Sequence, residues 1–216
     1  MVLSQSIEDY LKVIYTLELE NRATTKKIAE AMEISSASVT NMIKRLAKMG
    51  LLDHTSYKGV SLTDTGKKVA LEIVRHHRLL ELYLSEVMGY TWDEVHDEAE
   101  KLEHHISEQF EDKMAELLDH PTHDPHGDPI PTKDGSLPMT ASCRLCDAEE
   151  QKTYLVGRVT NQESELLRYL EEIGLLPGTK IKLLEKKPFK GPLNLLIEDN
   201  KESIGYEVAT HIYVTE

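Results

Sequence analysis

Amphipathic segments separated by short polar breaks fill the first quarter of the chain. Apolar residues recur at three- and four-residue steps over 6–19, 24–32 and 36–48, which predicts three helices, and Gly50 ends the third. A turn of three to four residues joins the second helix to the third. This arrangement is typical of a helix-turn-helix, whose second helix can enter the major groove of DNA.

A β-hairpin is expected directly after these helices. Residues 51–54 and 60–63 have the pattern of two short strands, and the turn between them contains Lys58 and Gly59. Three helices followed by a hairpin form a winged helix, in which Lys58 would lie at the wing tip near a phosphate backbone. The alternative is a small helical domain whose Ser- and Thr-rich third helix is merely a solvated face.

Polar and basic side chains lie outside the apolar positions of the predicted second and third helices. Such side chains can bind base edges and phosphates. Within 24–68, eight basic residues stand against four acidic ones, which is the sign of charge that phosphates require. The candidate DNA contacts are Lys26, Lys27, Ser36, Ser38, Thr40, Asn41, Lys44, Arg45 and Lys58.

Two long helices are predicted next. The first runs from residue 63 or 64 to near Gly89, and the second from Thr91 to about residue 118, with Glu94 at the capping-box position. An apolar stripe along the second helix should be buried against other helices. It consists of Val95, Ala99, Leu102, Ile106 and Phe110.

Histidines and glutamates gather beside that stripe. At about 100° per residue, four of them fall within one quarter-turn of a continuous helix. They are His96, Glu100, Glu103 and His104, whereas His105 points elsewhere. Crowded carboxylates repel one another, and a divalent cation removes that penalty. The alternative is an acidic helix with scattered histidines.

The preceding helix adds two more potential ligands. His77 and Glu81 are four residues apart, so they share a face and could meet the first group if the helices pack antiparallel. All these ligands offer oxygen or imidazole nitrogen, and none offers a thiolate. This set suits Mn(II) or Fe(II), although Zn(II) or Co(II) could substitute in vitro.

The part of the chain that follows the predicted long helices begins with an irregular segment. Residues 119–150 are rich in Pro, His, Asp and Gly, which indicates a tether or an extended loop. Cys143 and Cys146 lie in it and could form half of a zinc site with His120, His123 or His126, or a redox pair; an incidental surface pair is the default interpretation. The remainder predicts a small β-barrel with a helix over 164–173 and strands over 155–159, 180–184, 193–197, 203–206 and 211–214.

Charge is unevenly distributed along the 216 residues. The net charge of −13 argues against binding to nucleic acid, but residues 1–75 carry 11 basic against 9 acidic side chains, so the excess of acidic residues lies downstream.

No apolar run approaches a membrane span and the start lacks the features of a signal peptide, so a cytoplasmic protein is expected. A metalloenzyme that uses the His/Glu cluster is an alternative, which the absence of an HExxH, a phosphate loop or a nucleophile motif disfavours. A winged-helix sensor of an organic ligand is a further alternative.

Several motifs follow one another in a specific order. They are Ser6-Ile7-Glu8-Asp9-Tyr10-Leu11, Thr63-Asp64-Thr65-Gly66, His77-Arg78-Leu79-Leu80-Glu81, the segment from His96 to His104, and the segment from His120-Pro121 to Pro131. Together they resemble the diphtheria toxin repressor family of metal-dependent transcriptional regulators, in particular its manganese-responsive branch. The resemblance covers essentially the whole chain.

The resemblance implies a primary metal site that joins the first helix to the fifth. Carried over residue by residue, its ligands are Asp9, Glu100, Glu103 and His104. Iron-type members have Met and Cys where this chain has Asp9 and Glu100, so the resemblance implies Mn(II) as the effector, with Fe(II) as the alternative. Some two-domain manganese regulators have a glutamate where Lys12 stands, which puts their closely spaced binuclear arrangement in doubt here.

An ancillary site is implied as well. Its candidate ligands are His77, Glu81 and His96, or Glu81 with Asp124 and His126. A side chain of the last domain would complete it, from Gln162, Glu163 or Glu165, and Glu163 is favoured. The alternative for the loop residues is a polar linker.

We therefore predict a mainly α-helical protein with a small β domain. The expected parts are a winged helix-turn-helix DNA-binding domain over 1–74, a helical metal-binding and dimerisation domain over 75–140, a linker over 141–153 and an SH3-like, FeoA-type β-barrel over 154–216. The resemblance implies a homodimer that binds double-stranded operator DNA and represses metal-uptake genes. Mn(II) would act as the corepressor that links the first two domains.

Overall fold

The computed structural model describes residues 3–19, 23–55, 59–138 and 142–216. The chain forms two compact units. The first comprises Met1–His76, Glu103–Ile106 and Pro131–Ser136. The second comprises His77–Leu102, Ser107–Ile130 and Leu137–Glu216.

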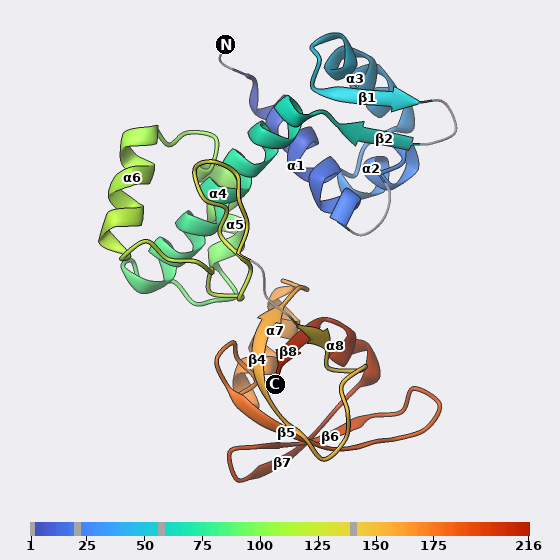
Figure 1. Ribbon diagram of the computed structural model, residues 1–216, viewed down its shortest axis with the longest axis vertical. Helices are drawn as coiled ribbons and strands as arrows, with labels where there is room; N and C mark the ends of the chain where they lie inside the picture. The colour runs from blue at the N-terminus through green and yellow to red at the C-terminus, as the bar shows by residue number, and fades with distance from the viewer. Residues whose placement is uncertain (1–2, 20–22, 56–58, 139–141) are drawn as a thin grey trace. The chain divides into compact units, whose positions relative to one another are not determined.

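Eight helices and eight strands occur in the described residues (Figure 1). The helices are α1 (Gln5–Leu19), α2 (Thr25–Ala31), α3 (Ser36–Lys48), α4 (Asp64–Glu86), α5 (Val95–Leu102), α6 (Glu108–Leu117), α7 (Ser164–Glu172) and α8 (Tyr206–Thr210). The strands are β1 (Leu52–Thr55), β2 (Gly59–Leu62), β3 (Cys143–Arg144), β4 (Thr153–Val159), β5 (Lys180–Lys186), β6 (Leu193–Ile197), β7 (Asn200–Ile204) and β8 (Ile212–Thr215).

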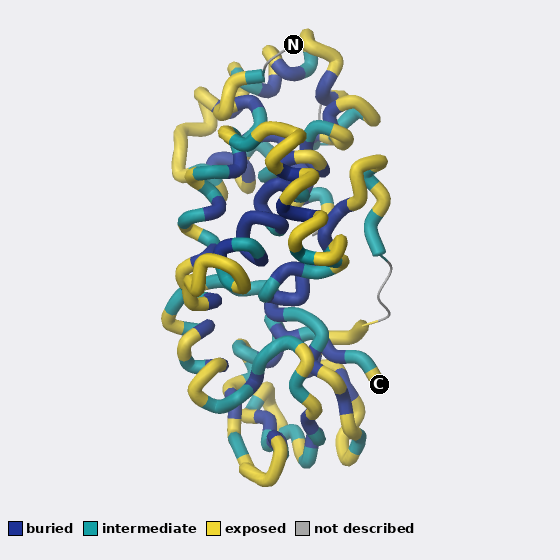
Figure 2. The backbone as a smooth tube through the Cα atoms, turned by 90° about the vertical axis from the view of Figure 1, so that its left-hand side faces the viewer, coloured by how far each residue is buried: buried dark blue, intermediate teal, exposed yellow. Residues whose placement is uncertain are grey.

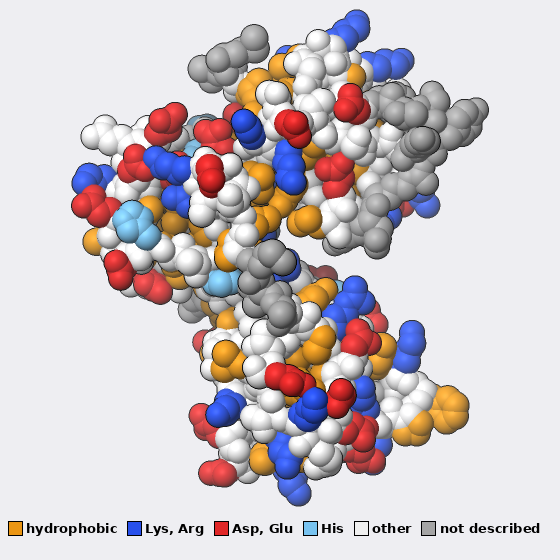
Figure 3. All heavy atoms as spheres, in the orientation of Figure 1, with side chains coloured by type: hydrophobic (Ala, Val, Ile, Leu, Met, Phe, Trp, Pro, Cys, Tyr) orange, Lys and Arg blue, Asp and Glu red, His pale blue; other side chains and the backbone are white. Residues whose placement is uncertain are grey.

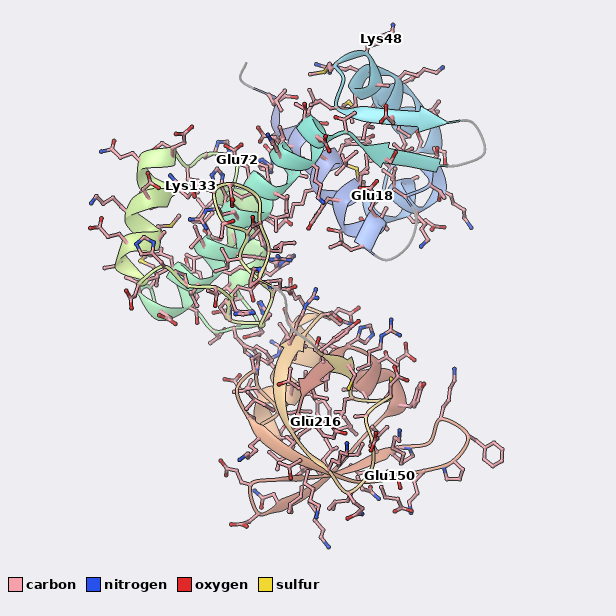
Figure 4. The ribbon with its side chains drawn as sticks, in the orientation of Figure 1. Glu18, Lys48, Glu72, Lys133, Glu150 and Glu216 are labelled. Carbon is pink, nitrogen blue, oxygen red and sulfur yellow. The ribbon has the colours of Figure 1, made fainter. Side chains whose placement is uncertain are left out.

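The first three helices and the β1–β2 hairpin confirm the predicted winged helix. Side-chain caps explain where the helix-turn-helix is interrupted, because Thr24 begins α2 and Ser35 begins α3, each hydroxyl accepting a backbone N–H of the first turn. The strands pair antiparallel, and Glu18 on α1 (labelled in Figure 4) accepts a hydrogen bond from the Leu62 N–H at 3.1 Å. Lys58, the predicted wing tip, lies outside the described residues.

A six-stranded antiparallel sheet in the order β3-β8-β4-β5-β6-β7 forms the last domain. Along β6, Leu193, Leu195 and Ile197 are buried while the residues between them are half-buried, as expected of a strand with one face on the core. Buried and exposed stretches alternate along the backbone (Figure 2). Helix α7 adds Leu167 and Leu170 to that core. The predicted β domain is therefore confirmed.

The segment predicted as a linker belongs to this domain instead. β3 pairs with β8, and Leu145, Cys146 and Ala148 lie in the core of the sheet. The sequence did not predict β3 because this apolar stretch is too short to show the alternation of a strand, and it follows a Pro-rich loop. Cys143 is exposed and Cys146 is buried, so they are not a surface pair, and neither belongs to a cluster of potential metal ligands among the described residues.

The helix predicted over 91–118 is broken in two. α5 ends at Leu102 and α6 begins after Ser107, whose hydroxyl accepts the Phe110 N–H. The interruption changes the phase of the helix, so Phe110 is exposed and does not continue the buried stripe of Val95 and Ala99. The signal for the break was Ser107, a favourable N-cap inside an otherwise helical pattern.

The end of the chain also differs from the prediction. The strand expected over 203–206 lies earlier, at β7, and the short helix α8 follows it. β7 is the edge strand of the sheet and is mostly polar, so it has little hydrophobic alternation to detect. No helix in the described residues is long and apolar enough to cross a membrane.

Candidate metal centre

The first cluster joins α1 to the turn that follows α5, within the first unit. Nε2 of His104 lies 2.7 Å from Oδ1 of Asp9 and 3.2 Å from Oε1 of Glu103. Nδ1 of His104 lies 2.7 Å from Glu8. Glu103 and His104 are almost fully buried, whereas Asp9 is partly exposed. Two carboxylates and an imidazole thus converge on one point, as a divalent cation requires.

A lysine on α1 pairs with the buried glutamate of this cluster. Nζ of Lys12 donates to both carboxylate oxygens of Glu103, at 2.9 and 2.7 Å. A buried carboxylate is costly without a counter-charge, and the ammonium group supplies one. Lys12 therefore stabilises Glu103 in the position from which its carboxylate faces Asp9 and His104.

The second cluster lies in the second unit, between α4 and α5. Nε2 of His77, Nδ1 of His96 and Oε1 of Glu81 form a triangle with sides of 2.9, 3.1 and 3.1 Å. Glu100, one turn after His96, lies 4.0 Å from its other ring nitrogen. Two imidazoles and a carboxylate arranged on one face are a ligand set found in iron sites.

The third cluster shares Glu81 with the second. It adds Asp124 and His126 from the loop after α6, and all three residues are buried. Three of their atoms, Oε2 of Glu81, Oδ2 of Asp124 and Nδ1 of His126, are buried without a hydrogen-bond partner. Buried polar atoms are normally satisfied, so this group fits a site for a cation.

Neighbouring backbone groups orient the loop ligands. Nε2 of His126 donates to the Trp92 carbonyl at 2.8 Å, so Nδ1 is the ring nitrogen that faces the cluster. Oδ1 of Asp124 accepts the N–H groups of His126 and Asp128, so Oδ2 faces the cluster. Arg78 approaches that oxygen at 3.7 Å.

Protonation in this cluster is shifted by burial and by charge. Burial raises the pKa of Asp124 well above its usual range, and the Glu81 carboxylate raises it further. Burial also acts to raise the pKa of Glu81, but His77, His126 and His96 outweigh it and hold that pKa well below its usual range. Burial thus favours the protonated form of Asp124, and a divalent cation would have to compete with that proton.

The structure thus divides the predicted ligands into two groups, although the helical wheel places them on one face. Glu103 and His104 accompany Asp9 in the first unit, whereas His96 and Glu100 accompany His77 in the second. The wheel failed here because α5 ends at Leu102, so Glu103 and His104 lie in a turn. Glu163 is exposed next to α7 and belongs to none of the ligand clusters in the described part of the chain.

The sequence analysis missed three residues that shape these clusters. Glu8 contacts His104, and Trp92 holds His126 through its carbonyl. The sequence analysis considered Lys12 only as the residue that stands where some two-domain manganese regulators have a glutamate. Its position one turn after Glu8 and Asp9 was the available signal, since a lysine there shares their helix face.

The predicted DNA-binding side chains lie on the exposed surface of α2 and α3. Figure 3 shows lysine and arginine side chains projecting from this part of the molecule. Val39, Ile43 and Leu46 face the core, which turns the polar side of α3 outward. The exposed residues are Lys26, Lys27, Ser36, Ser38, Thr40, Asn41, Lys44 and Arg45.

Models of known domains match nearly the whole chain. Residues 2–60 match the iron dependent repressor N-terminal DNA binding domain, residues 63–132 its metal binding and dimerisation domain, and residues 143–216 the FeoA domain. The diphtheria toxin repressor of Corynebacterium efficiens is 35% identical over 196 residues, 86% of this chain and 85% of the relative. The chain belongs to the diphtheria toxin repressor family.

Other members of the family differ in the metal that their names give. The iron-dependent repressor of Mycobacterium leprae is 29% identical over 98% of this chain and 97% of its own. A solved manganese-dependent transcriptional repressor in complex with manganese is 36% identical with a TM-score of 0.89, covering 97% of this chain and 99% of that one. The chain is therefore a metal-dependent DNA-binding repressor and not an enzyme.

Proposed function

We propose that this family member is a homodimeric repressor of metal-uptake genes with Mn(II) as its corepressor. The observation that carries the proposal is the convergence of Asp9, Glu103 and His104. This group offers hard oxygen atoms and one imidazole without a thiolate, a combination that suits Mn(II). Glu100 is expected as a further ligand on the resemblance alone, since it lies with His77 and His96 in the structure.

The chain around this cluster suggests how metal would control DNA binding. Asp9 belongs to α1 of the winged helix, and Glu103 and His104 belong to a four-residue segment whose neighbours on both sides are part of the second unit. A bound cation supplies the positive charge that allows the two carboxylates to lie side by side. Asp9 and His104 then hold the winged helix to this segment and restrict its orientation.

Dimerisation would give that restriction its effect on DNA. Two recognition helices must lie about 34–36 Å apart, or a multiple of that distance, to enter major grooves on one side of the duplex. Exposed apolar side chains suited to a second copy lie at the end of α4 and on α6, within the residues that match the dimerisation domain. They are Val87, Met88, Phe110 and Leu117.

Metal-titrated operator binding tests this function. Duplexes selected from a random pool by the Mn(II)-loaded protein provide the operator probe. The protein treated with EDTA should bind the probe weakly, and Mn(II) should restore binding by about 100-fold or more under anaerobic conditions. Equal binding with and without metal would contradict the proposal and favour an organic effector.

Fe(II) is the alternative corepressor. The triangle of His77, His96 and Glu81 is the observation that favours it, because two imidazoles and one carboxylate on a face are common ligands of Fe(II). The same anaerobic titration with Fe(II) separates the two metals. Activation by Fe(II) at lower free concentration than Mn(II) would assign iron as the effector.

A further inference from the structure

The loop between β5 and β6 displays an aromatic side chain to solvent. Phe189 has a relative exposure of 101%, so the described chain covers none of its ring. The loop extends away from the sheet (Figure 1), and the neighbouring Lys187, Pro188 and Lys190 are exposed as well. A single exposed apolar residue is common on protein surfaces, so the conformation that holds it there is the more informative feature.

The backbone holds Phe189 outward in an unfavourable conformation. The Gly191 N–H donates to the Pro188 carbonyl at 3.0 Å, which closes a tight turn. The two residues inside the turn, Phe189 and Lys190, have φ angles of +58° and +56°. Turns with positive φ at both central positions strongly favour Asn and Gly, because other residues are strained in the left-handed region. The strain indicates that the phenyl ring has a role beyond reversal of the chain.

The base of the loop is fixed to the rest of the domain. Nζ of Lys186 donates to the carbonyl groups of Cys146 at 3.2 Å and Ala148 at 2.8 Å. Nζ of Lys190 lies 5.4 Å from the centroid of the Tyr206 ring. A fixed base below an exposed ring is suited to insertion into a partner, because little conformational entropy is lost on binding.

The charge of the loop indicates the kind of partner. Residues 185–192 contain three lysines and one glutamate, although the whole chain has a net charge of −13. The glutamate, Glu185, pairs with Lys187 at 2.8 Å. Because salt screens charges beyond a Debye length of about 8 Å, the local excess of lysine determines the attraction at the tip. The loop therefore favours an anionic surface.

The apolar area of the loop is small and isolated. Among the described residues of this domain, the other exposed large apolar residue is Leu155, which pairs with Lys180 at the end of β5 opposite to the loop. The apolar contact is therefore one ring of about 200 Å². Specific protein interfaces bury about 1,200 Å² or more and require a complementary pocket for such a ring. A fluid bilayer accepts a projecting ring without a preformed pocket.

We propose that the β5–β6 loop binds the surface of membranes that contain anionic lipids. The Phe189 ring enters the boundary between headgroups and acyl chains, and the ammonium groups of Lys187 and Lys190 face the lipid phosphates. Surface binding of this kind needs no membrane-spanning helix. It goes beyond the proposed metal-dependent repression and does not depend on it.

Vesicle binding of the full-length protein tests the proposal. Partition coefficients are measured by flotation at low salt, with vesicles of phosphatidylglycerol and phosphatidylcholine in equal parts and with vesicles of phosphatidylcholine alone. The wild type should prefer the anionic vesicles by about 10-fold or more, and about 0.5 M salt should remove that preference.

Variants of the loop assign the binding to it. Phe189→Asn should bind the anionic vesicles about 10-fold more weakly or less, because the apolar contact is lost. The double variant Lys187→Gln/Lys190→Gln should lose about 10-fold as well. Leu155→Asn is the matched control, because it removes an exposed apolar side chain elsewhere in the same domain, and it should bind as the wild type does.

Thermal unfolding of Phe189→Asn separates display of the ring from a structural role. Asn tolerates a positive φ better than Phe, so this variant should melt at a higher temperature than the wild type while it loses vesicle binding. A lower melting temperature would show that the ring stabilises the fold and would contradict the proposal.

Insertion of the ring has its own spectroscopic signature. Trp92 is the single tryptophan of the chain and is buried, so the added fluorescence of Phe189→Trp reports on position 189. Anionic vesicles should shift this emission to shorter wavelength, and brominated acyl chains should quench it. Leu155→Trp should show neither effect.

Two results would overturn the proposal. Equal vesicle binding by the wild type and Phe189→Asn, together with an unshifted emission in Phe189→Trp, would assign the binding to another basic surface, such as that of α3. No vesicle binding by the wild type would leave a folded protein with an apolar pocket as the class of partner. Operator binding with Mn(II) should be the same in Phe189→Asn and the wild type, so the proposed repression is tested separately.

Discussion

Single side chains determine the chemistry of each cluster, and their residue types were largely visible in the sequence. Asp9, Glu103 and His104 were expected together and lie together. What could not be predicted is how each charge is balanced, because that depends on contacts between residues about 90 positions apart. Lys12 and Glu103 are the main example.

Replacement of Lys12 tests that balance at the residue scale. In Lys12→Met the buried Glu103 carboxylate loses its ammonium partner, so the metal-free protein should lose about 2 kcal/mol of unfolding free energy. Bound Mn(II) should restore most of this loss, because a cation then supplies the missing charge. Thermal unfolding in EDTA and in Mn(II) measures both values.

Lys113→Met is the matched control for that experiment. Lys113 is exposed and pairs with Glu116 on the same helix, so its loss should change stability by less than about 0.5 kcal/mol in either condition. An equal destabilisation of Lys12→Met with and without metal would show that Lys12 does not substitute for the cation.

Helices and strands were predicted well where one period continued without interruption. The bounds of α3 and β6 coincide with the expected ranges, because a buried apolar stripe sets them. The prediction failed where tertiary contacts override a local pattern, at the turn before Ser107 and at β3. That turn matters for the proposed function, since it separates Glu103 and His104 from the candidate ligands on α5.

The recognition helix gives a prediction at the scale of the element. Lys44 lies on the exposed face of α3, where a phosphate contact is expected. Lys44→Gln should weaken binding similarly for all duplexes and reduce the slope of log K against log salt by about 1. Fluorescence anisotropy over a range of salt concentrations measures this slope.

Asn41→Ala, by comparison, should weaken operator binding and relax sequence preference, and an unchanged preference would exclude Asn41 from base contact.

The loop that carries Asp124 and His126 gives a second prediction at this scale. Gly127 has φ +82°, and a Cβ there would lie 1.9 Å from the Gly157 carbonyl oxygen, which belongs to β4. Gly127→Ala should therefore cost about 3 kcal/mol or more of unfolding free energy. Gly178→Ala is the control, because Gly178 has a similar φ of +88° with open space around it and should cost only about 1 kcal/mol. Equal losses in denaturant unfolding would show that the contact with β4 is unimportant.

At the scale of the whole molecule, the two recognition helices of a dimer must act together. The acidic residues lie mainly outside the winged helix, so their repulsion from phosphate confines DNA binding to the basic part. The exposed apolar residues just after α4 and on α6 are expected to hold the dimer. The sequence could not separate them from core positions, because the phase of α6 depends on the break before it.

A charge on the apolar face of α6 should dissociate the dimer. Leu117 is 62% exposed, so Leu117→Glu leaves the fold of the chain intact while placing a carboxylate in the proposed interface. The variant should sediment as a monomer and bind a full operator about 100-fold more weakly than the wild type. Exposed Glu116→Gln on the same helix should do neither, and a dimeric Leu117→Glu protein would place the interface elsewhere.

The central claim is that a cation held by Asp9, Glu103 and His104 controls DNA binding, and the most direct test is the ratio of operator affinities with and without Mn(II) in Asp9→Ala. The wild type and Asp97→Ala, an exposed carboxylate outside the clusters, should both show a ratio of about 100 or more. Asp9→Ala should show a ratio below about 5 while it keeps the weak metal-free binding of the wild type. An Asp9→Ala ratio equal to that of the wild type would contradict the account.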